Sequence, residues 1–224
     1  AGSSHEVVGA PSDAIAYSLS RMPATYAAVS RVLDEVIARA PGFAPATLLD
    51  AAAGPGTAAW AAAESFEGIS GTLFDHNAEF IALARTIGDE LLGETEVLSH
   101  DLTRFDLGRH FDLVTCAYAL TELGDTAVVH TAQRLWDHTA GLLVVVEPGR
   151  PRDYQRLMAV RSRLVELGGT ILAPCPHDAP CPLVAPDWCH FSVRLSRSRD
   201  HMRLKGGTLG YEDEKYSYLV VARP

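Results

Sequence analysis

Hydrophobic residues near the N-terminus recur at the three- to four-residue spacing of a single helix face. The residues that share this spacing are Tyr26, Val29, Leu33, Val36 and Ile37. The pattern predicts a helix over residues 24–38, preceded by a shorter helix that Ser12 caps. Pro23 stands between the two, and we expect it to interrupt the helical pattern because proline lacks an amide donor.

Short apolar runs alternate with helix-like segments from Thr47 onward. The runs interpreted as strands cover residues 47–50, 71–74, 96–98, 111–118, 142–146, 191–195 and 216–221. The segments interpreted as helices cover residues 58–66, 78–92, 126–138 and 152–167. Strands that alternate with helices pair in parallel through right-handed crossovers. The pattern therefore predicts an α/β fold with a doubly wound, mostly parallel sheet of seven strands.

Charge is distributed unevenly about a formal net charge of −9. Residues 1–150 hold eight Lys or Arg against twenty Asp or Glu, whereas residues 151–224 hold eleven against eight. The basic residues that gather in the second part are Arg194, Arg197, Arg199, Arg203 and Lys205. Such a patch is a candidate contact for RNA phosphates, and its alternative is an ordinary solvated face. No apolar run approaches the ~18 residues of a membrane span, so we expect no membrane partner.

Acidic residues and a glycine turn follow the first three predicted strands. Asp50 runs into a turn that contains Gly54 and Gly56, and Asp75 and Asp101 follow the next two strands. Ligands of open α/β sheets bind at these strand ends, where the strand order reverses. We expect the glycines to let the backbone approach a ligand closely. Asp75 is placed to accept hydrogen bonds from two ribose hydroxyls, and Asp101 to lie near an adenine amino group.

The glycine turn differs from two common nucleotide motifs. Ala59 occupies the third glycine position of a dinucleotide fingerprint, and no Gly-Lys-Ser/Thr follows as in a P-loop. D-x-A-x-G-x-G instead resembles motif I of the class I methyltransferases that use S-adenosylmethionine, with Ala52 where that motif usually has glycine. The residues that this resemblance assigns to the cofactor are Asp50, Ala52, Gly54, Gly56, Asp75, His76, Asp101, Leu102, Cys116 and Tyr118. The alternative is an ordinary strand–helix turn with solvated acids.

Three of the four cysteines fall in a proline-rich stretch without helical or strand periodicity. Cys175, Cys181 and Cys189 lie within fifteen residues of one another. Soft sulfur ligands at this density suggest zinc or an iron–sulfur cluster. His177 or His190 could complete a tetrahedral zinc site. Three unliganded thiols remain the plain alternative.

Six blocks along the chain stand in an order shared with one known family. They cover residues 21–26, 50–56, 173–177, 181–182, 188–191 and 209–218. Together they resemble the methyltransferase-like proteins of the small ribosomal subunit found in bacteria and mitochondria, over nearly the whole chain from about Tyr17. The Cys-Pro-His, Cys-Pro and Trp-Cys-His blocks are the most specific part of this resemblance.

The resemblance implies a class I methyltransferase (Rossmann-like) fold, S-adenosylmethionine binding and a [4Fe–4S] cluster on four cysteines. Three of these match Cys175, Cys181 and Cys189, and the fourth lies further downstream in the family; zinc is the alternative metal. It also implies binding to the small ribosomal subunit and its rRNA, in rRNA methylation or subunit assembly. We expect a cytoplasmic bacterial protein that is a monomer when free.

On this basis we divide the chain into four parts. An N-terminal helical lid (1–45) precedes the cofactor-binding core (46–170), and a Cys-rich metal-binding insertion (171–190) precedes C-terminal strands that complete the sheet (191–224). The residues of the lid expected to cover the pocket are Tyr17, Arg21 and Tyr26.

The sequence does not name a catalytic residue. Amino-group methyltransferases often carry an Asn/Asp-Pro-Pro-Tyr/Phe loop after the fourth strand, where this chain reads Ala-Tyr-Ala-Leu at residues 117–120. Tyr118 and Glu122 are the best candidates for a base or an orienting group. Two alternatives to an rRNA methyltransferase remain open. One is a non-catalytic assembly factor, and the other is a small-molecule methyltransferase with a zinc-stabilised loop.

Overall fold

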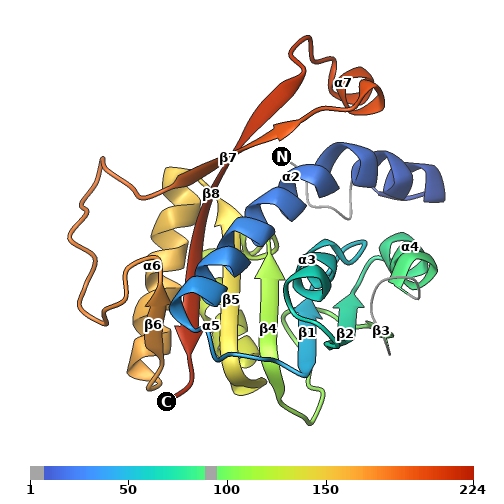
Figure 1. The fold of residues 1–224 in the computed structure, drawn as a ribbon. Coiled ribbons are helices and arrows are strands. Elements are labelled where there is room, and N and C mark those ends of the chain that lie inside the picture. Colours follow the sequence, from blue (N-terminus) through green and yellow to red (C-terminus); the bar gives the residue numbers. More distant parts are fainter. Residues whose placement is uncertain (1–7, 89–94) are drawn as a thin grey trace.

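The computed structural model describes residues 8–88 and 95–224, which build one mixed sheet covered by helices (Figure 1). The strands are β1 (Thr47–Ala51), β2 (Ser70–Asp75), β3 (Thr95–Ser99), β4 (Phe111–Ala117), β5 (Thr139–Pro148), β6 (Thr170–Ala173), β7 (Phe191–Ser196) and β8 (Tyr211–Ala222). The helices are α2 (Pro11–Arg39), α3 (Thr57–Ser65), α4 (Ala78–Gly88), α5 (Asp125–Asp137), α6 (Pro151–Glu166) and α7 (Arg199–Lys205). A short 3₁₀ turn, η1, covers Leu120–Glu122. The end of the helix predicted over 78–92 lies outside the described residues.

The sheet runs in the order β3-β2-β1-β4-β5-β8-β6, with β7 paired to β8. The first five strands of this order pair in parallel, whereas β8 is antiparallel to β5, β6 and β7. The chain therefore winds outward from β1 to β3 and then returns to β4 on the other side of β1. The carboxyl ends of β1 and β4 meet at this reversal, the place where open α/β sheets bind ligands.

The parallel, doubly wound core is confirmed, but the predicted strand number of seven is wrong. The described sheet has eight strands, because β6 pairs with β8 through Ile171 and Ala173. This four-residue strand is too short to produce a recognisable alternation of polar and apolar residues.

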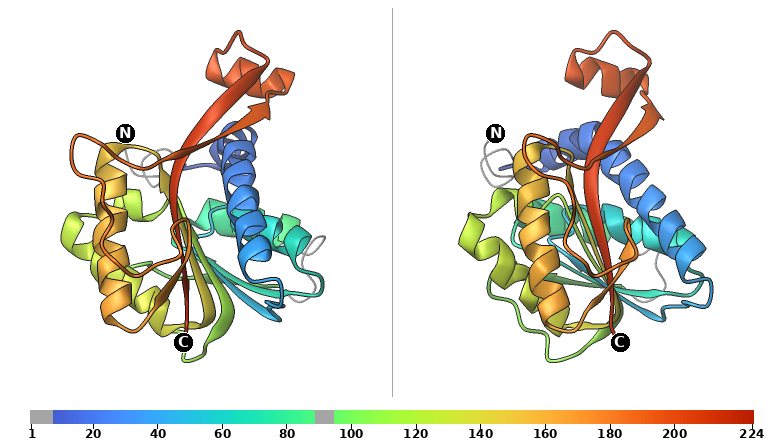
Figure 2. Two further views of the ribbon diagram at one scale, coloured as in Figure 1. Left: turned by 60° about the vertical axis from the view of Figure 1, so that its left-hand side comes forward. Right: turned by 90° about the vertical axis from the view of Figure 1, so that its left-hand side faces the viewer.

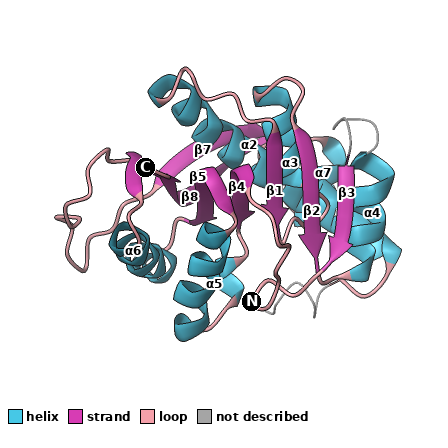
Figure 3. Ribbon diagram, turned by 90° about the horizontal axis from the view of Figure 1, so that it is seen from below, coloured by secondary structure: helices cyan, strands magenta, loops and turns pink. Residues whose placement is uncertain are grey.

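Both faces of the parallel strands are covered, so their sequences read as continuous apolar runs. Leu48 of β1 packs in a core cluster with residues of α2 and α3, whereas the next residue, Leu49, packs in a cluster with residues of α5 and α6. Figures 2 and 3 show these helix layers on opposite sides of the sheet. Successive side chains of a strand point to opposite faces, which is why adjacent leucines serve different layers.

The two predicted N-terminal helices form one continuous helix, α2, which passes through Pro23. It begins at Pro11 without a side-chain cap, so the predictions of a Ser12 cap and of a break at Pro23 are both wrong. Val29, Val32 and Leu33 are at most 1% exposed against the sheet. Their burial outweighs the hydrogen bond that Pro23 cannot donate.

The C-terminal strands divide into a buried and a projecting part. Residues from Tyr216 to Ala222 of β8 pair with β5 inside the sheet. The earlier residues of β8 pair with β7, and together with α7 they form an arm that extends beyond the sheet (Figure 1). The 174–190 segment between β6 and β7 contains neither helix nor strand.

Candidate functional site

A cavity of about 360 Å³ lies at the carboxyl ends of β1, β2 and β4, at the reversal of strand order. Of the residues predicted to bind a cofactor, those that line it are Asp50, Ala52, Gly54, Asp75, His76, Asp101, Leu102 and Tyr118. The remaining two, Gly56 and Cys116, do not line it. The structure thus brings together side chains from four separate loops around one hollow.

The turn between β1 and α3 contains three residues in the left-handed region of backbone conformation. Ala52, Gly54 and Gly56 have φ values of 53°, 56° and 90°. Gly56 is the N-cap of α3, and a Cβ atom added there would lie 3.0 Å from the side chain of Leu73. A glycine is therefore required at position 56, where the chain enters α3. Gly56 shapes this turn without lining the cavity.

Asp50 is fully enclosed at the floor of the cavity. Its Oδ2 accepts a hydrogen bond from the Ala59 N–H at 3.0 Å, and its Oδ1 accepts one from the Thr115 hydroxyl at 2.8 Å. Burial raises the pKa of this carboxyl to about 7, although both hydrogen bonds act in the opposite direction. Asp50 therefore links the two strands that meet at the reversal and places a titratable group under any ligand.

Asp75 ties the second strand to the glycine turn. Its Oδ2 accepts a hydrogen bond from the Gly54 N–H, and its Oδ1 accepts one from the Asn77 N–H, both at 2.8 Å. A carboxylate offers about four acceptor positions, so these bonds leave room for further donors from a ligand. Asp75 is only 6% exposed and faces the cavity.

Asp101 lies at the outer rim of the cavity, beyond β3. Its Oδ1 accepts hydrogen bonds from the backbone N–H and the hydroxyl of Thr103, at 2.7 and 2.6 Å. These bonds hold the pKa of Asp101 below its usual value. Asp101 and Thr103 therefore form a hydrogen-bonded turn, and Leu102 and Thr103 line the cavity beside Asp101.

Cys116 and Tyr118 have different surroundings although they are two residues apart. Cys116 is fully buried in the core cluster on the α5–α6 side, and burial raises the pKa of its thiol well above the ordinary value. Tyr118 follows β4 with a positive φ of 58° and lines the cavity. Burial, together with the nearby Glu214 carboxylate, raises the pKa of its phenol, so it is neutral at physiological pH.

Helix α2 forms one wall of the cavity, and of its lining residues only Tyr17 was predicted from the sequence. Tyr17 lines the cavity and packs its ring against Phe80 at 4.9 Å between centroids. Met22 and Thr25 also line it and were not predicted. The two are three residues apart and so share one face of the continuous helix, a relation that the predicted break at Pro23 concealed.

A larger groove of about 1130 Å³ adjoins the cavity. The residues that line both are Tyr17, Tyr118, Glu122 and Leu123. Arg21, which was predicted to cover the pocket, lines this groove instead. Tyr26 packs against the core cluster beneath α2. The cavity thus opens sideways into a channel between α2, η1 and the start of α6.

Three of the five basic residues counted in the 194–205 stretch are paired with acids of β8. Arg194 forms an ion pair with Asp213 at 2.7 Å, directly opposite in the β7–β8 register. Arg197 and Lys205 both contact Glu212, at 2.7 and 2.8 Å. The excess positive charge counted along the stretch is therefore reduced in the folded arm.

Of the three loop cysteines Cys175, Cys181 and Cys189, Cys181 contacts the start of α6. The Tyr154 hydroxyl lies 3.1 Å from the Cys181 sulfur. Burial first, then this contact and the charges of the three cysteines, raises the pKa of Tyr154. Burial first, and then the other two thiols, raises the pKa of Cys189. Among the described residues, however, no group of three or more His, Cys, Asp or Glu side chains is arranged to hold a metal ion. The donor type suits a metal, but the ligand set is incomplete.

The sequence profile of the family "Mitochondrial small ribosomal subunit Rsm22" matches residues 11–224. The chain belongs to the Rsm22 family. A human relative, the mitochondrial ribosome assembly protein METTL17, is 32% identical over 227 residues. The match covers 93% of this chain and 48% of the relative, so the chain spans about half the length of that protein.

Solved structures show that this Rsm22-family chain has a class I methyltransferase-like fold. The magnesium protoporphyrin IX methyltransferase of Synechocystis, solved with bound S-adenosylhomocysteine, aligns with a TM-score of 0.57 at 15% identity, over 87% of this chain and 83% of that one. The [4+2]-cyclase SpnF aligns with a TM-score of 0.53 at 19% identity, over 87% and 80% of the two chains. A cyclase shares the fold, so the fold alone does not establish methyl transfer. Within the described residues, no helix is long and apolar enough to cross a membrane.

Proposed function

We propose that this protein binds S-adenosylmethionine and acts on the small ribosomal subunit, in rRNA methylation or in subunit assembly. The observation that carries the proposal is the cavity at the strand reversal, lined by Asp50, Gly54 and Asp75, in a chain of the Rsm22 family. The Synechocystis methyltransferase of the same fold has also been solved with S-adenosylmethionine, which supports the choice of cofactor.

Each part of the lining has a proposed partner on the cofactor. The turn at Ala52 and Gly54 contacts it through backbone, and Asp75 accepts hydrogen bonds from the ribose hydroxyls. His76, Asp101 and Leu102 surround the adenine at the rim. Gly56 and Cys116 act from beneath, Gly56 by shaping the turn and Cys116 by packing the strand that ends at the cavity.

Assembly without catalysis is the form of this function that the site favours. Tyr118 lines the cavity, but its raised pKa makes it a poor base at neutral pH. Glu122 stands between cavity and groove and remains the candidate base if methyl transfer occurs. A small-molecule methyltransferase is the remaining alternative. The wide groove beside the cavity disfavours this alternative, because a small substrate needs no such channel.

We also propose that Cys175, Cys181 and Cys189 are ligands of one metal centre, a [4Fe–4S] cluster rather than zinc. Support comes from the soft donor type of three cysteines within one short loop and from the family resemblance of the blocks that contain them. A bound centre would cross-link a loop that otherwise has no regular structure. The fourth ligand is either a histidine of this loop or a residue supplied from elsewhere.

The proposed partner is the rRNA of the small subunit. The residues of the arm proposed to contact it are Arg199 and Arg203, together with Arg194, Arg197 and Lys205. The proposed setting is the bacterial cytoplasm, with a free protein that is monomeric. The excess of 17 Arg over two Lys supports a source with a GC-rich genome. The human relative is mitochondrial, so subcellular fractionation of the source organism tests this setting.

Two measurements on the same preparation test the proposed function. Calorimetry with S-adenosylmethionine and S-adenosylhomocysteine measures cofactor binding, and sedimentation with purified small and large subunits measures partner choice. Binding of the cofactor together with selective co-sedimentation with small subunits is expected. Transfer of tritiated methyl groups to the rRNA then separates methylation from assembly. Failure of both binding measurements would remove the proposal.

A further inference from the structure

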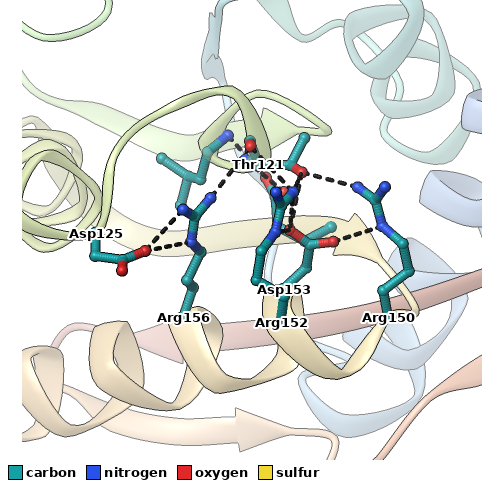
Figure 4. A network of polar contacts seen from close by, with 8 residues as sticks. Thr121, Asp125, Arg150, Arg152, Asp153 and Arg156 are labelled. Carbon is teal, nitrogen blue, oxygen red and sulfur yellow. Dashed lines mark hydrogen bonds and ion pairs between the residues drawn. The ribbon is translucent and has the colours of Figure 1, made fainter. Parts of the chain in front are cut away.

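Three arginines at the start of α6 stand side by side and converge on Thr121 of η1 (Figure 4). Arg150 donates from Nη2 to the Thr121 hydroxyl at 3.0 Å, and Arg152 donates from Nη2 to the same oxygen at 2.9 Å. Arg156 donates from Nη1 to the Thr121 carbonyl at 3.2 Å. Three positive charges are thus fixed at one end of the groove.

A buried carboxylate holds this cluster in place. Asp153 is 1% exposed and receives hydrogen bonds from Arg150 at 2.7 Å and from Arg152 at 3.0 Å. Thr121 is itself fixed, because its backbone N–H donates to the buried Glu147 carboxyl at 2.8 Å. The guanidinium groups therefore lose little conformational freedom when they bind a ligand, which favours affinity.

The cluster keeps unused donors on its exposed side. The side chains of Arg150 and Arg152 are 54% and 57% exposed, and the Nη1 group of each makes no hydrogen bond within the described residues. The carboxylates that pair with the three arginines are Asp153 and the 85% exposed Asp125. Asp125 is exposed to solvent, but the Arg156 side chain is only 15% exposed, so the donors open to an incoming anion are those of Arg150 and Arg152.

The position of the cluster links it to the cofactor cavity. The three arginines form one end of the groove, whose lining also contains the basic residues Arg21 and Lys215 and the acidic residues Asp13, Glu122, Asp213 and Glu214. The groove shares Tyr17 and Tyr118 with the cavity. An extended polyanion lying along the groove would pass the mouth of the cavity. Arg194, Arg197 and Lys205 of the arm do not line this groove, so they lie off that route.

We propose that Arg150, Arg152 and Arg156 bind the phosphodiester backbone of single-stranded RNA in this groove. Planar guanidinium groups with fixed donors match phosphate oxygens, and arginine makes these contacts in a paired geometry. An acidic peptide offers similar carboxylates, but the continuity of groove and cofactor cavity favours a nucleotide chain. This proposal rests on the proposed function and adds to it the surface that receives RNA.

The test measures binding of a fluorescein-labelled 12-nucleotide oligouridylate by anisotropy between 50 and 200 mM salt. Arg150→Ala and Arg152→Ala are measured singly, so that Asp153 keeps one guanidinium partner in each variant. Arg163→Ala is the matched control, because Arg163 lies on the same helix and pairs with Glu166 at 3.2 Å. Thermal unfolding and S-adenosylmethionine calorimetry of each variant verify that fold and cavity are intact.

Each single variant is expected to weaken RNA binding about three- to tenfold and to reduce the slope of log K against log salt by about 0.7, the value for one phosphate contact on a single strand. Arg163→Ala should change neither quantity. Unchanged RNA affinity in Arg150→Ala and Arg152→Ala would overturn the proposal, and so would an equal loss in Arg163→Ala. Loss of binding to polyglutamate without loss of RNA binding would also overturn it, in favour of an acidic protein segment. None of these outcomes bears on the proposed function itself, which is tested separately by cofactor and subunit binding of the unaltered protein.

Discussion

The Asp75 carboxylate accepts a hydrogen bond from the Gly54 N–H at 2.8 Å, which joins the tip of β2 to the glycine turn after β1. The two residues lie 21 positions apart in the sequence and line the same cavity. The acid that is proposed to bind the ribose therefore also determines the shape of the turn that is proposed to approach the cofactor.

This double role can be separated by experiment. Asp75→Ala is expected to weaken S-adenosylmethionine binding by about 1.5–3 kcal/mol, the scale of hydrogen bonds to a charged group. The comparison uses a cofactor analogue that lacks both ribose hydroxyls. If Asp75 contacts the ribose directly, the unaltered protein should bind this analogue more weakly than the cofactor. Asp75→Ala should bind the analogue and the cofactor equally well. Calorimetry of the two proteins with the two ligands makes this comparison. Equal losses for the analogue in both proteins would show that Asp75 acts only by shaping the turn.

The wall formed by α2 gives a second prediction. Tyr17 packs against Phe80 and faces the cavity, and burial raises the pKa of its phenol. Tyr17→Ala is expected to weaken cofactor binding about tenfold, because it opens the cavity toward the groove. Tyr17→Phe keeps the ring contact and should bind nearly as well as the unaltered protein. Calorimetry checks both, and an equal loss in the two variants would assign the effect to the hydroxyl.

The sequence predicted the parallel core and the acids at its strand ends because these features are local: each apolar run ends in its own acid. It did not predict the pairing of Arg194 with Asp213, which depends on cross-strand register. The predicted strand began at residue 216, whereas β8 begins at Tyr211 and so brings Glu212 and Asp213 opposite β7. Pro23 was read as a break because a sequence pattern cannot measure the packing that keeps α2 continuous.

The cysteine loop supports a prediction about metal content. Protein purified without oxygen is expected to contain iron and sulfide and to absorb near ~400 nm, and Cys175→Ser, Cys181→Ser or Cys189→Ser should each remove this absorbance. Cys116→Ser is the matched control, since Cys116 is buried in the core away from the loop. Its absorbance per folded molecule should be unchanged. Colourless protein with one stoichiometric zinc would contradict the cluster but support the three cysteines as metal ligands. Protein that contains neither iron nor zinc would contradict the ligand assignment itself.

The last prediction concerns the buried carboxyl that supports η1. Glu147 is 2% exposed and accepts hydrogen bonds from the N–H groups of Leu120 and Thr121, yet burial raises its pKa from 4.5 to about 8. Between these two values the folded protein retains a proton that the unfolded chain releases. The unfolding free energy should therefore fall as the pH rises from about 5 to about 8. Asp50, whose pKa is raised to about 7, contributes with the same sign over the lower part of this range.

Glu147→Gln isolates the contribution of Glu147 to this profile. The glutamine amide does not titrate, so the variant should keep only the part of the pH dependence that Asp50 supplies and should level off near pH 7. The glutamine NH₂ group also faces a backbone N–H whose hydrogen bond the carboxyl had accepted. Loss of this hydrogen bond is expected to lower the unfolding free energy by about 1–3 kcal/mol at pH 5.5. As the pH rises, the unaltered protein loses the stabilisation due to the Glu147 proton, so the difference between the two should shrink by pH 8.5. Urea unfolding at several pH values measures both curves. Parallel curves would mean that Glu147 is already ionised in the folded protein and that its two N–H donors outweigh its burial.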